Sequence, residues 1–101
     1  MTLPVELHPE AIVESRASRL WYSERSSKLA DEFLDELDIG IAQIGQFPTR
    51  WPTFLHGTRH YLMRRFPYVI VYRIREESIQ IIAVAHCNRE PGYWSARLRR
   101  D

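Results

Sequence analysis

The segment after the last predicted strand concentrates the side chains best suited to chemistry. It reads His86-Cys87-Asn88-Arg89-Glu90-Pro91-Gly92-Tyr93-Trp94. A histidine can act as a general base, an arginine can hold a phosphate, and aromatic side chains can stack on RNA bases. We therefore take His86, Arg89 and Tyr93 as candidate catalytic residues, which are also candidate target-binding residues. The alternative interpretation is that Tyr93 and Trp94 pack the tail against the sheet while Arg89 pairs with an acid.

Basic residues are concentrated in the same half of the chain. Residues 1–50 hold nine acids and five bases, whereas residues 51–101 hold four acids and nine bases, all of them arginine. Because the guanidinium fork suits phosphate and carboxylate, a polyanion or an acidic peptide is a natural partner, although a solvated arginine-rich surface would give the same count. The candidate target- or phosphate-binding residues are Arg64, Arg65, Arg73, Trp94 and Arg97.

Motifs for other chemistries are missing from the sequence. The four glycines are isolated, so there is no glycine-rich phosphate loop and no nucleophile elbow, and the four histidines lack metal-ligand spacing. We therefore predict neither a metal nor a cofactor. The single cysteine, Cys87, cannot form an internal disulfide, which is typical of a reducing compartment such as the cytoplasm.

The length and composition indicate a small folded unit. With 101 residues, a formal net charge of +1 and 45% hydrophobic residues, we expect one domain spanning residues 1–101, neither disordered nor a coiled coil. Residues 1–10 lack the features of a secretory signal, and no run of 18 apolar residues exists to cross a membrane.

Two helices are expected after a short N-terminal strand at residues 3–7. The first spans Glu10 to about Glu24, and the second runs from a cap at Ser26 or Ser27 to Phe47, where Pro48 prevents extension. The apolar stripe of the first helix consists of Val13, Ala17, Leu20 and Trp21. That of the second consists of Ala30, Phe33, Leu34, Leu37, Ile41 and Ile44.

Three antiparallel strands are expected in the second half, at residues 59–66, 69–75 and 78–86. Strict alternation in the last strand groups Ile79, Ile81, Ala83 and Ala85 against Gln80, Ile82, Val84 and His86. One sheet face then packs on the two helices while the other stays partly open. A short helix from Pro91 leads to the tail arginines Arg97, Arg99 and Arg100. The prediction is a small α+β domain with an N-terminal strand, a two-helix hairpin, a three-stranded antiparallel sheet and a short C-terminal helix.

Three stretches of this sequence resemble the RelE/ParE superfamily of bacterial toxins from type II toxin–antitoxin modules. They are Tyr61–Ile74 (YLMRRFPYVIVYRI), Ile81–His86 (IIAVAH) and Arg89-x-Pro91-Gly92-Tyr93-Trp94. The resemblance covers essentially the whole chain, and the C-terminal stretch is its specific part. It implies an α+β fold and a cognate antitoxin that wraps and neutralises the toxin in a hetero-oligomer.

Two targets are known within that superfamily. RelE-like members cut messenger RNA on the ribosome with the help of arginines, lysines and a tyrosine, whereas ParE-like members bind DNA gyrase and block replication. By this resemblance, Arg89 would stabilise the phosphorane and Tyr93 would assist proton transfer.

Two departures favour the ParE-like branch, although the fold alone does not separate the branches. The residue after Tyr68 is Val69, where RelE-like enzymes keep an arginine, and their lysines near the preceding strand are absent. Arg64, Arg65 or His60 would have to substitute for them. The expectation is thus a gyrase inhibitor, with an RNA-cleaving toxin as the alternative and a degenerate toxin that only binds its antitoxin as the third.

Overall fold

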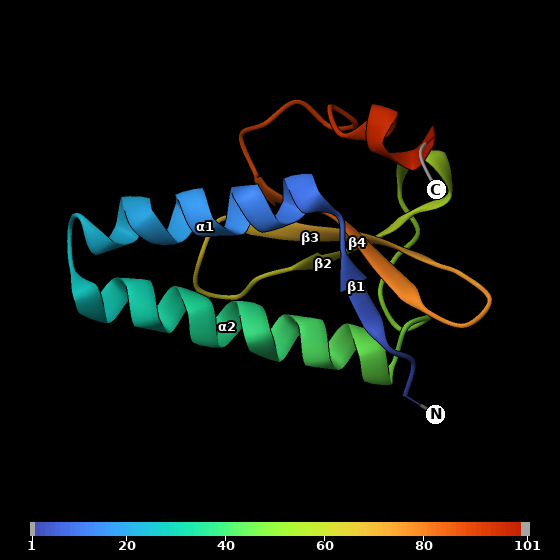
Figure 1. Cartoon of the computed structure of the whole chain (residues 1–101), viewed down its shortest axis with the longest axis horizontal. Helices are drawn as coiled ribbons and strands as arrows, with labels where there is room; N and C mark the ends of the chain where they lie inside the picture. The colour runs from blue at the N-terminus through green and yellow to red at the C-terminus, as the bar shows by residue number, and fades with distance from the viewer. Residues whose placement is uncertain (1, 100–101) are drawn as a thin grey trace.

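The computed structural model describes residues 2–99, so the predicted tail arginine Arg100 lies outside the described residues. The chain order is β1 (Val5–Leu7), α1 (Pro9–Ser23), α2 (Ser27–Gln46), η1 (Leu55–Gly57), β2 (Arg59–Leu62), β3 (Tyr68–Ile74), β4 (Ile79–His86) and η2 (Ser95–Arg99). Two long helices lie side by side against the sheet, as Figure 1 shows. The predicted α+β class is confirmed.

Local sequence signals set the helix ends. The side chain of His8 accepts a hydrogen bond from the Glu10 amide at the start of α1, and Pro9 occupies the first turn. Ser26 caps α2 by accepting from the Leu29 amide at 3.3 Å. The helix then ends at Gln46, just before Phe47 and Pro48. Both helices therefore lie within a residue or so of their predicted ranges.

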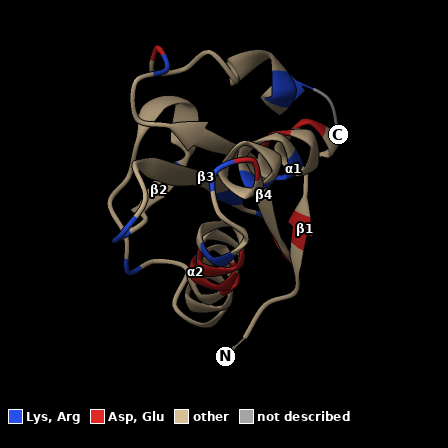
Figure 2. Cartoon of the chain, turned by 90° about the vertical axis from the view of Figure 1, so that its left-hand side faces the viewer, with Lys and Arg blue, Asp and Glu red and all other residues tan. Residues whose placement is uncertain are grey.

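The sheet is mixed and contains four strands in the order β1-β4-β3-β2. The pairings of β2 with β3 and of β3 with β4 are antiparallel, as predicted. The N-terminal strand joins them, because β1 pairs in parallel with the first half of β4. In Figure 2, β1 and β2 lie at the two edges with β4 and β3 between them. The strand β2 is shorter than predicted and ends at Leu62, before a bend at residues 64–67.

The main core lies between the sheet and the helices. From α2 it takes Phe33, Leu37 and Ile44, three residues of the predicted stripe, and it takes Ile70 and Tyr72 from β3. The aromatic rings pack edge to face, with Phe33 and Phe66 centroids 5.4 Å apart. The predicted apolar stripe of α2 therefore does face the sheet.

The apolar stripe of α1 does not face the core. Val13, Leu20 and Trp21 are 59%, 61% and 49% exposed, and the one residue of α1 that is fully buried is Ala11. The helix packs through Ala11 and Tyr22, on its other side. Helical spacing reveals an apolar face but cannot tell whether that face meets the core or solvent, which is why the stripe did not predict the packing side.

An irregularity in β4 breaks the predicted alternation. Val71 pairs with Ala83, but the next residue, Tyr72, pairs with Ile81, so Ile82 is an extra residue in the ladder. Side chains beyond the bulge therefore change face. Ile79, Ile81 and Val84 belong to the core under the helices, whereas Ile82, Ala83 and Ala85 pack on the opposite face.

The opposite face of the sheet is covered by the C-terminal tail. Trp94 is 2% exposed and packs with Val71, Ile82, Ala83 and Ala85. This face is therefore more closed than predicted, because Phe54, Tyr93 and Leu98 pack around the same cluster as the indole of Trp94. The tail holds turns at residues 91–94 and then a 3-10 helix, Ser95–Arg99, in place of a helix starting at Pro91. Within residues 2–99, no helix is long and apolar enough to cross a membrane.

Candidate functional site

The carboxylate of Glu14 joins α1 to the C-terminal tail. It accepts a 2.5 Å hydrogen bond from the Tyr93 hydroxyl and two bonds of 2.9 Å from the Arg97 guanidinium. The side chains of Glu14 and Arg97 are each only 15% exposed, so water competes weakly for this pair. Two of the predicted site residues, Tyr93 and Arg97, therefore converge on an acid that the sequence analysis did not single out.

The position of Glu14 follows from how β4 is paired. The strand β1 covers the edge of β4 only as far as Ile81, which leaves backbone groups beyond it without a strand partner. The Glu14 carboxylate accepts from the Val84 amide at 3.0 Å, and Arg97 donates to the Ile82 carbonyl at 3.0 Å. These side chains thus satisfy buried polar groups of the uncovered edge, as a neighbouring strand would.

This network favours the neutral form of Tyr93. Burial, the hydrogen bond to Glu14 and the negative charge of Glu14 raise the pKa of Tyr93 well above 10, and the nearby arginines offset this only in part. Burial lowers the pKa of Arg97, but its bonds to Glu14 outweigh that effect and raise it overall. The Tyr93 hydroxyl therefore stays protonated and donates its hydrogen bond to the Glu14 carboxylate.

Arg89 lies over this network but remains exposed. Its guanidinium carbon is 3.8 Å from the centre of the Tyr93 ring, which is a cation–π contact. The carbon of Arg97 lies 5.3 Å from the same ring. Arg89 and Tyr93 are thus adjacent, although the contact uses the ring of Tyr93 and leaves its hydroxyl on Glu14.

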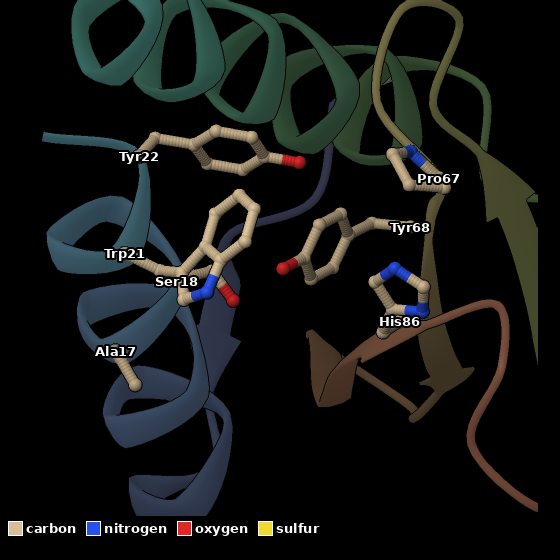
Figure 3. A pocket seen from close by; sticks show the side chains of 7 residues that line it. All are labelled: Ala17, Ser18, Trp21, Tyr22, Pro67, Tyr68 and His86. Atoms are coloured by element: carbon tan, nitrogen blue, oxygen red, sulfur yellow. The ribbon is translucent and has the colours of Figure 1, made fainter. Parts of the chain in front are cut away.

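His86 lies elsewhere, on the helix side of the sheet. Its Nδ1 accepts a hydrogen bond from the Asn88 amide at 3.0 Å, so the neutral ring carries its proton on Nε2. Its ring meets that of Tyr68 edge to face at 5.1 Å. It lines the pocket that Figure 3 shows.

That pocket is open, apolar and walled by aromatic rings. It measures about 550 Å³ and lies between the second half of α1 and the adjoining ends of β3 and β4. Figure 3 shows Trp21, Tyr22, Tyr68 and His86 around it. The Arg25 guanidinium carbon lies 3.4 Å from the centre of the Trp21 ring and holds that side chain in place. The exposed α1 stripe borders the pocket through Ala17 and Trp21, and that stripe was the one sequence signal for it.

The remaining candidate residues are dispersed. Arg65 binds Glu32 on α2 at 3.1 Å, and Arg73 donates to Gln80 and to the Leu98 carbonyl. Arg64 is exposed beside β2, while Trp94 is buried. The structure therefore does not bring the strand arginines into one basic groove with Arg89 and Tyr93. The catalytic and target-binding roles of these residues stay predictions.

Comparison with known proteins identifies the family. The sequence model described as "ParE toxin of type II toxin-antitoxin system, parDE" matches residues 5–91. The chain belongs to the ParE toxin family. A solved structure described as "Chromosomal ParDE TA system from P. aeruginosa" contains a chain that superposes on this ParE-family chain with a TM-score of 0.75 at 16% identity, covering 84% of this chain and 96% of that one. No curated protein matches the sequence. The chain is thus a toxin of the type II toxin–antitoxin class.

Proposed function

We propose that this ParE-family toxin arrests growth by binding and inhibiting DNA gyrase, and that a cognate antitoxin neutralises it. The observation that carries the proposal is the bond between the Tyr93 hydroxyl and Glu14. A nuclease would need that hydroxyl at the reacting phosphate, together with several converging cations. Here Arg97 is paired with Glu14, and Arg65 is paired with Glu32 on another element.

The exposed apolar face of α1 supports action by protein binding. Val13, Leu20 and Trp21 are each about half or more exposed, and the aromatic pocket continues that surface. Large apolar side chains gathered on one face, next to a hollow, are typical of sites that bind another protein. The similarity to a chain of a solved ParDE toxin–antitoxin structure supports an antitoxin partner for this chain as well.

Expression of the chain in a bacterial host tests the proposal. We expect growth arrest with impaired DNA supercoiling and intact messages, relieved when the product of the neighbouring gene is expressed with it. Cleaved messages with normal supercoiling would instead favour the ribonuclease alternative. A host that grows normally would leave only the degenerate toxin and would contradict the proposal. Arg89→Ala tests the surface around the tail, because it removes the cation over the Tyr93 ring and leaves the hydrogen bonds of Glu14 in place.

A further inference from the structure

Two arginines flank the α1 stripe on the side away from the aromatic pocket. Arg16 and Arg19 are exposed and, together with Leu20 and Ser23, line a surface hollow of about 350 Å³. Arg16 lies three residues after Val13 and four before Leu20, so its charge stands on the helix surface beside these exposed apolar side chains. The α1 stripe therefore has a basic border on one side and an aromatic hollow on the other.

These two arginines lack an acidic partner among the residues that the structure describes. No acid stands three or four residues from Arg16 or Arg19 along the helix, which is the spacing at which helical ion pairs form. No ion pair or side-chain hydrogen bond of either one is found within residues 2–99, whereas Arg65 and Arg97 each bind a carboxylate. Arg16 and Arg19 also repel each other weakly, because they are like charges three residues apart. A carboxylate brought by a partner would be attracted by both.

We propose that the α1 stripe with Arg16 and Arg19 is the surface that binds DNA gyrase, and that the partner surface is acidic. Val13, Leu20 and Trp21 would be buried at the centre of this interface, and the two arginines would meet carboxylates at its rim. The inference rests on the proposed function, because gyrase is the target proposed there.

Charge argues against a second copy of this chain on the same surface. A symmetric pair of α1 helices would cross near Ala17, in the middle of the stripe, and would bring Arg16 of each copy close to that of the other. Like charges facing each other across an interface oppose association. Nucleic acid fits less well too, because its phosphates would meet the arginines and leave Val13 and Leu20 uncovered. An acidic protein surface suits both the cations and the apolar side chains.

The test is a titration of purified gyrase with the chain, in which binding is measured without DNA and supercoiling with it. Leu20→Asp and Leu20→Arg remove the same apolar side chain and add opposite charges. Because the partner surface is acidic, we expect Leu20→Asp to weaken binding at least about tenfold more than Leu20→Arg does. Leu20 is exposed, so both variants should unfold close to the wild-type temperature.

The arginines are tested by a salt dependence. Arg16→Ala combined with Arg19→Ala should weaken binding several-fold at low salt and less at high salt, because salt screens exposed charges. Replacement of both arginines by glutamate should weaken it further. Lys28→Ala is the matched control, since it removes one exposed cation from α2, and it should leave binding unchanged.

The outcomes separate this inference from the proposed function. Gyrase binding by the wild-type chain that all these variants leave unchanged would overturn the inference alone, and so would equal losses for Leu20→Asp and Leu20→Arg. A wild-type chain that neither binds nor inhibits gyrase would overturn both. Variants that weaken binding to the product of the neighbouring gene, or to DNA alone, and leave gyrase binding intact would assign the surface to that partner and overturn the inference.

Discussion

Three side-chain hydrogen bonds join Glu14 to the C-terminal tail. Its carboxylate accepts hydrogen bonds from the Tyr93 hydroxyl and the Arg97 guanidinium of the tail and from the Val84 amide of β4. Loss of the carboxylate would leave an unpaired guanidinium and an unsatisfied amide, each mostly buried. At the scale of single residues, the segment taken as a candidate catalytic region therefore fastens the tail to α1 through Glu14, Tyr93 and Arg97, which we call the Glu14 latch.

Replacement of Glu14 tests this latch. We expect Glu14→Ala to lower the free energy of unfolding by about 2 to 3 kcal/mol, because it strands a buried charge and an amide. Glu10→Ala, an exposed position on the same helix, should stay within about 0.5 kcal/mol of wild type. Denaturant titration measures both, and equal stabilities for the two variants would contradict the assigned role of Glu14.

Tyr93 predicts a pH dependence in the alkaline range. Burial and Glu14 raise its pKa in the folded chain, while the unfolded chain releases that proton near pH 10. Above that pH the unfolded state binds fewer protons than the folded state, so the free energy of unfolding falls as the pH rises. Tyr93→Phe should show a shallower fall between about pH 9 and about pH 11 in denaturant titrations. Equal slopes in wild type and variant would count against the raised pKa.

At the scale of elements, α2 lies close against the sheet at Gly40. A Cβ built there would lie 2.8 Å from Ile70 Cδ1 and 2.9 Å from Tyr61 Cε1. Alanine normally stabilises a helix interior by about 1 kcal/mol relative to glycine. We expect the reverse for Gly40→Ala, a loss of about 1 to 3 kcal/mol, because two core side chains must move. A higher melting temperature for this variant would show that the contact is looser than described.

Burial predicts different losses of stability for two apolar helix residues, Leu20 of the α1 stripe and Phe33 of α2. Leu20 is 61% exposed and Phe33 is fully buried. Leu20→Ser should therefore change the free energy of unfolding by less than about 0.5 kcal/mol, whereas Phe33→Ala should cost about 3 to 5 kcal/mol. Thermal unfolding of both proteins decides the matter. A large loss for Leu20→Ser would place the stripe in the core after all.

These elements and residues also show which features could be predicted from the sequence and which could not. The ends of α2 were predictable because Ser26 and Pro48 act locally, and the antiparallel strands followed from short connections. The bulge at Ile82 was not, since its neighbours are all apolar and give no local signal. Glu14 was also missed, because its contacts lie 70 to 83 residues away along the chain. Tyr93 was found because it follows the last predicted strand together with His86 and Arg89, and Arg97 was found through the charge asymmetry.

At the scale of the whole molecule, the open apolar surfaces belong to different elements. One is the α1 stripe with its aromatic pocket, and another lies beside β2, where Leu62 is exposed next to a cavity lined by Ile39 and Trp51. The tail closes the remaining sheet face through Trp94. This arrangement offers separate surfaces to protein partners and holds the hydroxyl of Tyr93 against Glu14, which accords with a toxin that acts by binding.

The most direct test of that account is the supercoiling activity of purified DNA gyrase titrated with this chain, with cleavage of ribosome-bound messenger RNA measured alongside. The account predicts that supercoiling falls with added toxin while the message stays intact, and that Tyr93→Phe retains the inhibition. Message cleavage that Arg89→Ala and Tyr93→Phe both abolish, with gyrase unaffected, would contradict it.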